Sequence, residues 1–356
     1  MNLKKLLFCA LFCATSALAQ FDNLRGPAYN PYGTLGAAPT IADLIAKPSD
    51  IYGHKFIYVA PIDYTGYSAF DLAGGSTFLG FGNSLILGYA KNSWGLALDL
   101  TLNKWWFSSG ERYSFDVQET LDGDNIGLNV SFAFKDFTVY GSTRWLTHRN
   151  AENYGDNTMS RGSAKNVRLG VVGGNKLIWD IALDFARREI DTYGLIYETN
   201  DILGAVNNDI LNTIRMKFNL GYKALQNDKA RLIVGLNNTF TWNLIEQDFY
   251  YYSFNDDFEL EAEQDFYELR LNISPNILGE VAFTKHLFAF IGACYDIYLL
   301  DLNGYVQSVQ NGYAYSYIGL RYEREGWAVE TRLRNVFEEG YDEKNPFINL
   351  GGFIYF

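Results

Sequence analysis

Apolar and polar side chains alternate one by one along most of this chain, and this pattern restricts its fold more than any other feature. In residues 94–103 the four leucines share one parity, whereas Asp99 and Thr101 share the other. Residues 126–135 and 267–283 repeat the pattern. Successive side chains of a β-strand point to opposite faces, so each segment is expected to be a strand with one apolar and one polar face.

Short and long connections alternate between these strands. Turns rich in Gly, Asn, Asp or Lys, which hairpins favour, are expected at AKNSWG, FKDFT, GGNKLI, LQNDKA, FTKHLF and EREGWA. Longer polar segments are expected at about 63–76, 103–124, 148–164, 190–211, 246–266, 302–312 and 338–346. About fourteen strands result, centred near residues 58, 84, 99, 130, 142, 169, 183, 218, 238, 275, 294, 318, 332 and 351.

The last ten residues, FINLGGFIYF, form one more alternating strand. A last strand leaves an open edge unless it pairs on both sides, and pairing with the first strand would close the sheet. No apolar run of roughly 18 residues follows residue 20, so we expect no spanning helix, whereas barrel strands cross with about ten alternating residues. We therefore expect an all-β fold, a transmembrane antiparallel up-and-down β-barrel of about 14 strands.

The residues before the first strand divide into two parts. Residues 1–19 have two lysines, an apolar run and the small-residue pattern Ala-Leu-Ala, and are expected to be a secretory signal peptide rather than a membrane anchor. Residues 20–53 hold four of the seven prolines and a short helix expected between Thr40 and Pro48. This segment is expected to be a periplasmic tail or a plug inside the barrel, which residues 54–356 would form.

These features resemble those of bacterial outer-membrane β-barrels over nearly all of residues 54–356. The resemblance implies that the terminal aromatic pair Tyr355 and Phe356 is the signal read by the barrel-assembly machinery, and that the outward face contacts outer-membrane lipid. It also implies location in the outer membrane of a Gram-negative-type bacterium. Fourteen strands after an N-terminal plug further resemble the FadL-like fatty-acid transporters, although Asn30-Pro31-Tyr32-Gly33 departs from their Asn-Pro-Ala-Gly-like motif. An exported soluble β-sandwich is the alternative fold.

Charged side chains on the polar parity are candidates to line the lumen. They either pair across strands and brace a water-filled interior, or set a field along a pore that favours anions. The candidates are Arg144, Arg168, Asp180, Asp184, Arg215, Lys217, Arg270, Glu280, Arg332 and Arg334. In addition, residues 246–265 carry eight acids and a Tyr-rich cluster, and are expected to be a solvated loop or a binding site for a surface partner, a cation or a sugar.

Other functional classes fit the sequence poorly. The net charge of −12 disfavours nucleic acid as a partner. Three scattered histidines, with no Ser or acid pattern beside them and one cysteine after residue 20, indicate neither an enzyme nor a metal site, and no cofactor is expected. We expect a passive channel or transporter for a small or hydrophobic solute, with a non-conducting structural or surface-binding barrel as the alternative.

Overall fold

The computed structural model describes residues 23–27, 33–62, 64–82, 84–101, 125–150, 158–198, 201–252, 259–303, 306–307, 313–334 and 348–356. Two short helices, α2 (Ile41–Ala46) and the 3₁₀ helix η1 (Pro48–Ile51), precede the strands. The strands are β1 (Phe56–Ala60), β2 (Thr65–Leu72), β3 (Gly75–Phe81), β4 (Leu85–Lys91), β5 (Trp94–Thr101), β6 (Asn125–Ala133), β7 (Phe137–Asn150), β8 (Thr158–Gly174), β9 (Leu177–Glu198), β10 (Asp201–Gln226), β11 (Ala230–Tyr252), β12 (Glu259–Ala282), β13 (Leu287–Asn303), β14 (Val306–Gln307), β15 (Tyr313–Arg324), β16 (Trp327–Arg334) and β17 (Ile348–Tyr355).

The sheet closes on itself through its first and last strands. β1 pairs antiparallel with β2 on one side and with β17 on the other, with Tyr58 opposite Phe353. The two-residue β14 pairs only with β13 in the described chain, so the barrel wall has 16 strands. The expected all-β, up-and-down barrel is therefore confirmed, with sixteen strands instead of about fourteen.

The two extra strands lie at the start of the barrel. Residues 65–72, expected in a long loop, form β2, and the strand expected near residue 84 is two strands, β3 and β4, on either side of a turn. β2 was missed because only half of its outward positions are apolar: Phe70 and Leu72 face outward, but so do Gly66 and Ser68. Its turn to β3 places Ala73 and Gly74 at φ 53° and 75°, which a hairpin usually gives to Asn-Gly.

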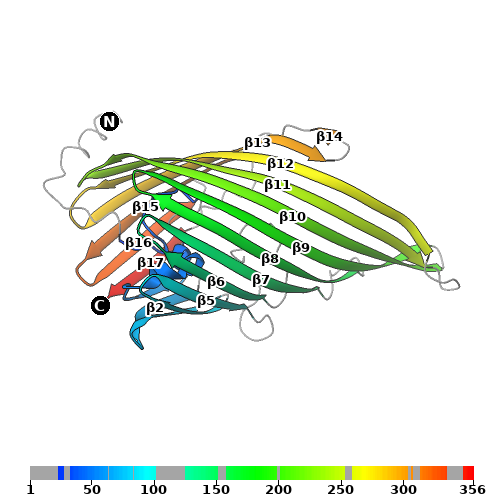
Figure 1. The fold of residues 1–356 in the computed structure, drawn as a ribbon, viewed down its shortest axis with the longest axis horizontal. Coiled ribbons are helices and arrows are strands. Elements are labelled where there is room, and N and C mark those ends of the chain that lie inside the picture. The colour runs from blue at the N-terminus through cyan, green and yellow to red at the C-terminus, as the bar shows by residue number, and fades with distance from the viewer. Residues whose placement is uncertain are drawn as a thin grey trace.

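Several expected long loops are also strands. β9 and β10 fill most of residues 190–211, and β11 and β12 fill residues 246–252 and 259–266, so the acidic segment 246–265 is mainly paired sheet. β10 has 26 residues, whereas a bilayer needs about 9–11 per strand. Figure 1 shows the green and yellow strands β8–β12 extending well past the short strands β2–β6 and β15–β17.

The two faces of the wall differ as the alternation predicts. Leu96 is 38% exposed on the outer face, whereas its neighbours on the inner parity, Ala97 and Asp99, are 0% and 8% exposed. On β8–β11 an outward row of register-paired apolar residues ends the apolar band: Val167, Phe185, Ile214 and Trp242. The next outward row includes Lys165 and Arg187, so β9 continues from there for about 12 residues, or roughly 40 Å of strand, beyond the apolar band.

Helix α2 begins with a complete capping box. The Thr40 hydroxyl accepts a hydrogen bond from the Asp43 N–H at 3.2 Å, and the Asp43 carboxylate accepts from the Thr40 N–H at 2.9 Å. Pro48 then starts η1, and the chain enters β1 after Gly53. Within the described ranges, no helix combines the length and the apolar character needed to cross a membrane.

An arginine at the outward position Leu98 is expected to cost about 2–4 kcal/mol of unfolding free energy near the bilayer midplane, because it would face lipid. The matched change Thr101→Arg on the inner face of the same strand should cost much less. Both variants would be unfolded in lipid vesicles by denaturant titration. Equal losses would contradict the assignment of the two faces.

Candidate functional site in the barrel lumen

The N-terminal segment lies inside the barrel and packs against one wall through apolar side chains. Ile41 and Leu44 of α2 and Ile51 of η1 are fully buried. They form one cluster with the inward-facing aromatic residues of β1, β3 and β17: Phe56, Tyr58, Phe78 and Phe353. At η1, the Ser49 N–H donates to the Ser131 hydroxyl of β6 at 2.7 Å, so polar contacts also attach this part of the segment.

The same segment reaches the opposite wall. Ala37 and Ala38 pack in a cluster with inward residues of β11, β12, β13 and β15, namely Ile233, Leu278, Phe290 and Tyr317. The carbonyl group of Leu35 lies against Gly221 of β10, so closely that a side chain at this glycine would overlap it. On the first wall, Gly95 of β5 is approached by the backbone of Pro48 in the same way. Residues 33–51 therefore cross the lumen from wall to wall.

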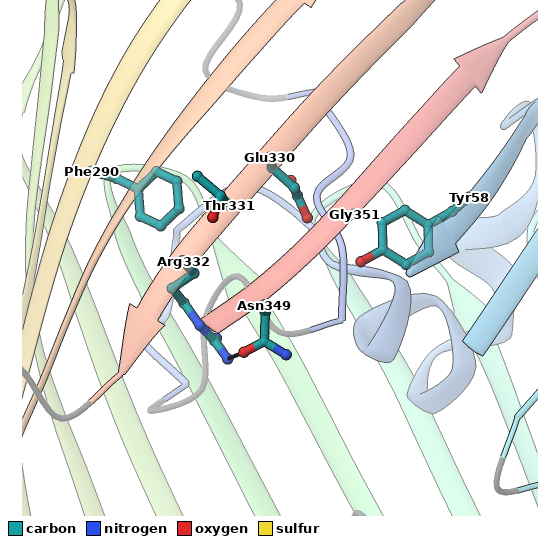
Figure 2. A pocket seen from close by; sticks show the side chains of 7 residues that line it. All are labelled: Tyr58, Phe290, Glu330, Thr331, Arg332, Asn349 and Gly351. Atoms are coloured by element: carbon teal, nitrogen blue, oxygen red, sulfur yellow. Dashed lines mark hydrogen bonds between the residues drawn. The ribbon is translucent and has the colours of Figure 1, made fainter. Parts of the chain in front are cut away.

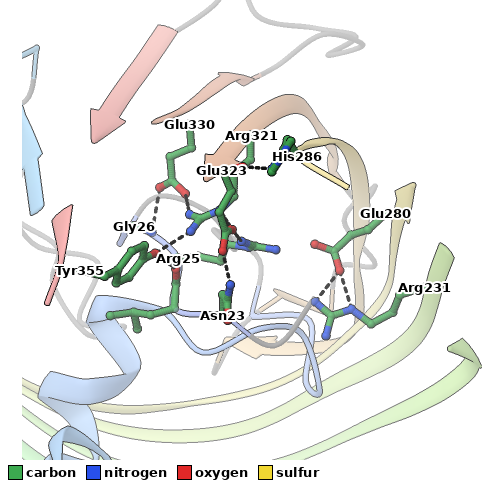
Figure 3. A network of polar contacts seen from close by, with 11 residues as sticks. Asn23, Arg25, Gly26, Arg231, Glu280, His286, Arg321, Glu323, Glu330 and Tyr355 are labelled. Carbon is green, nitrogen blue, oxygen red and sulfur yellow. Dashed lines mark hydrogen bonds and ion pairs between the residues drawn. The ribbon is translucent and has the colours of Figure 1, made fainter. Parts of the chain in front are cut away.

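A charged cluster holds the first described residues of the segment at the short-turn end (Figure 3). The Gly26 N–H donates to Glu330 at 2.8 Å, and the Arg25 guanidinium lies 3.5 Å from Glu323. Arg321 joins both acids, donating to Glu330 at 2.9 Å and to Glu323 at 2.8 Å. Arg25 and Arg321 are each 1% exposed, so water contributes little to balancing these charges.

Burial and the neighbouring charges shift the pKa of Arg25 in opposite directions. Burial lowers the pKa of Arg25 and the neighbouring Arg321 lowers it further, whereas Glu280, Glu330 and Glu323 raise it. A guanidinium remains charged at neutral pH despite such shifts. The cluster is thus a set of fixed charges that binds the segment through ion pairs.

The last two residues, Tyr355 and Phe356, lie in different environments. The Tyr355 hydroxyl accepts from Arg321 at 2.6 Å and donates to the Leu24 carbonyl at 3.3 Å, so it belongs to the same cluster. Phe356 is 63% exposed and lines an open cavity of about 650 Å³ at the short-turn end, together with Asn23, His54 and His286. Their role as an assembly signal stays a prediction.

Next to the cluster, Arg231 of β11 and Glu280 of β12 form an ion pair whose side chains are 0% and 2% exposed. On β16, two residues from Glu330 of the charged cluster, Arg332 donates to Asn349 at 3.0 Å beside a small cavity of about 10 Å³ that both residues line (Figure 2). The side chain of Arg334 lies outside the described part of the structure. Arg332 lies on β16, whereas Arg215 and Lys217 lie on β10.

The remaining candidates lie on the β7–β12 wall. Arg144 pairs with Asp99 at 3.2 Å, and Arg168 donates to both oxygens of Asp184 at 2.5 and 2.8 Å. Asp180 accepts from the Tyr140 hydroxyl at 2.7 Å. Strand register then places Asp184 opposite Arg215, so Arg168, Asp184 and Arg215 are neighbours across three strands. Lys217 follows on the same face of β10, and Arg270 contacts Glu268 on β12.

Sequence reasoning missed the residues that hold the segment in place. Arg25 was not a candidate, although it stands in a segment with few other charges before the first strand. Arg231 comes directly after the turn LQNDKA, where a basic residue is expected to be part of the turn rather than of a site. Within the described residues, no cluster of His, Cys, Asp and Glu side chains could hold a metal ion.

No protein-family model matches the sequence, and no curated protein matches it. Among solved structures, the translocator domain of the autotransporter NalP from Neisseria meningitidis has a TM-score of 0.40 at 10% identity, over 86% of this chain and 90% of that one. OmpT, an outer membrane protein of Vibrio cholerae, has a TM-score of 0.39 at 11% identity, over 85% and 94%. The ferric citrate transporter FecA has 0.42 at 11% identity, and the chain spans 43% of its length. Because these TM-scores and identities are low, the barrel assignment rests on the strand pairing described above.

Proposed function

We propose that this protein is an outer-membrane channel or transporter whose lumen is closed by its own N-terminal segment, acting as a plug. The observation that carries the proposal is the crossing of the lumen by residues 33–51, which contact β5 and β6 on one wall and β10–β13 on the other. Burying so many inward charges and amides in a dry core would cost much free energy, whereas the same groups remain hydrated in a water-filled path.

The apolar outer band supports location in the outer membrane, with lipid as the surrounding partner and the barrel-assembly machinery reading the last strand. We keep the expectation that the barrel is not an enzyme. A FadL-like transporter of hydrophobic solutes fits less well, because the wall has sixteen strands and the described lumen on β8–β12 is polar. The runner-up is a non-conducting barrel that binds a partner through the extended sheet of β9–β12.

Removing residues 22–50 should open a channel that is silent in the intact protein, or raise its single-channel conductance, because the wall-to-wall contacts would be lost. The measurement is conductance of both purified forms in a planar bilayer at the same salt and voltage. Heat-modified migration on a gel would show that the shortened chain still folds. Unchanged conductance in a folded deletion would contradict the plug, and silence of both forms would favour the non-conducting barrel.

A further inference from the structure

A row of basic residues crosses the lumenal wall on the long-strand side of the plug. Reading across β8 to β12, the inward positions in register are Arg168, Asp184, Arg215, Thr241 and Arg270. Neighbouring strands lie about 4.8 Å apart, so the three arginines recur at about 10 Å along the row. We call these five positions the arginine row.

The row carries more positive than negative charge. Its single acid, Asp184, is 2% exposed and is already bound by both donors of Arg168. Lys217 adds a further base two residues from Arg215 on the same face. On the wall from β5 to β12, the described inward bases are Arg144, Arg168, Arg188, Arg215, Lys217, Lys223, Arg231 and Arg270, and the described inward acids are Asp99, Asp180, Asp184, Glu268 and Glu280, of which Glu268 is paired with Arg270 and Glu280 with Arg231.

The acid-rich segment does not cancel this charge inside the lumen. Glu246 and Asp248 share the outward parity of Trp242 and Leu244 on β11, and Glu246 is paired in register with Asp265 of β12. The described inward position between them is Gln247. The extended sheet thus places these acids on its outer surface, and the inner surface leads to the arginine row.

We propose that the arginine row selects small anionic solutes, carrying a carboxylate or phosphate group, for passage through the lumen. This inference rests on the proposed channel function. Guanidinium groups bind both kinds of group through paired N–H donors, and rings or rows of Arg and Lys raise the local concentration of anions in a pore. Alternating guanidinium groups along a wall would also let an anion move between sites without leaving the positive field.

The test compares the wild-type sequence with the variant R215Q/K217Q, which removes two positive charges but leaves the Arg168–Asp184 pair intact. It uses the full-length protein and, where the plug keeps that form silent, the residue 22–50 deletion. Reversal potentials in a potassium chloride gradient give the permeability ratio of chloride to potassium. We expect the ratio to exceed one, and the variant to lower it by about twofold or more at 0.1 M salt, where charges act over about 10 Å. The control R187Q removes a base from the outer face of β9 and should leave the ratio unchanged.

A second readout does not require conduction. Binding of a trisulfonated pyrene dye to the detergent-solubilised full chain should weaken by about threefold or more in R215Q/K217Q and remain unchanged in R187Q. Silence of both the full-length protein and its residue 22–50 deletion, together with this dye pattern, would refute the channel and support the anion site. Conducting protein that prefers potassium, or a ratio and dye affinity that the double variant leaves unchanged, would overturn the anion inference while the channel function stands.

Discussion

Replacing Glu280 by glutamine is expected to lower the free energy of unfolding of the barrel by about 3–5 kcal/mol. The reason is that Arg231, whose side chain is 0% exposed, would keep its charge without its acidic partner. Glu280 also lies close enough to Arg25 to stabilise the charge of that guanidinium. The measurement is denaturant unfolding of the refolded protein in lipid vesicles, followed by tryptophan fluorescence.

Two controls separate the buried charge from a general effect of losing an acid. Arg187 and Glu189 form a pair of the same type, 2.7 Å apart, with side chains 54% and 51% exposed, so Glu189→Gln should cost less than about 1 kcal/mol. The double variant R231M/E280L replaces both charges with apolar groups and should recover most of the stability. A loss below about 1 kcal/mol in Glu280→Gln would show that water reaches the pair.

The barrel itself was predictable because side chains that face lipid are expected to be apolar, and most strands follow this rule. In β5 and β6 every outward position is apolar, and these strands form where the alternation places them. β2 obeys the rule only in part, since Phe70 and Leu72 face outward but so do Gly66 and Ser68, while the aromatic Tyr67 faces inward. The strand is formed because the neighbouring β1 and β3 offer hydrogen bonds on both sides, and that information lies outside its own sequence.

The length of β9–β12 could not be read from alternation for a related reason. Beyond the apolar band neither face meets lipid, so residues such as Glu246 and Asp248 occupy the outward parity that Trp242 and Leu244 occupy below. Backbone pairing nevertheless continues, with Glu246 opposite Asp265. A polar sequence without periodicity therefore reads as a loop even where the strand extends.

The sequence predicted which charged residues face the lumen, but not which of them lie next to one another. Alternation assigned Arg168, Asp184 and Arg215 to the lumen, and strand register was needed to make them neighbours. The charges that hold the plug, Arg25 and Glu323, are separated by almost the whole chain. No local pattern can link two such positions, because the contact exists only once the sheet has closed.

Valine at both Gly95 and Gly221 is expected to displace the plug and open the barrel without removing any residue. Both glycines lie on strands and face inward, and a side chain there would overlap the Pro48 backbone and the Leu35 carbonyl group. Glycine inside a strand otherwise weakens it, and valine is well suited to strands, so the wall should keep or gain stability. The plug must then move, because strands held by continuous pairing are harder to shift than a short segment.

The matched control is valine at Gly279 and Gly352, two outward positions where an added Cβ would lie 3.7 and 3.8 Å from its nearest neighbours. We expect conductance to rise to the level of the residue 22–50 deletion in G95V/G221V and to stay at the wild-type level in G279V/G352V. Protease cleavage within the N-terminal segment should become faster in the first variant only. Wild-type conductance in a folded G95V/G221V barrel would mean that the lumen is not closed at the positions where residues 35 and 48 meet the two walls.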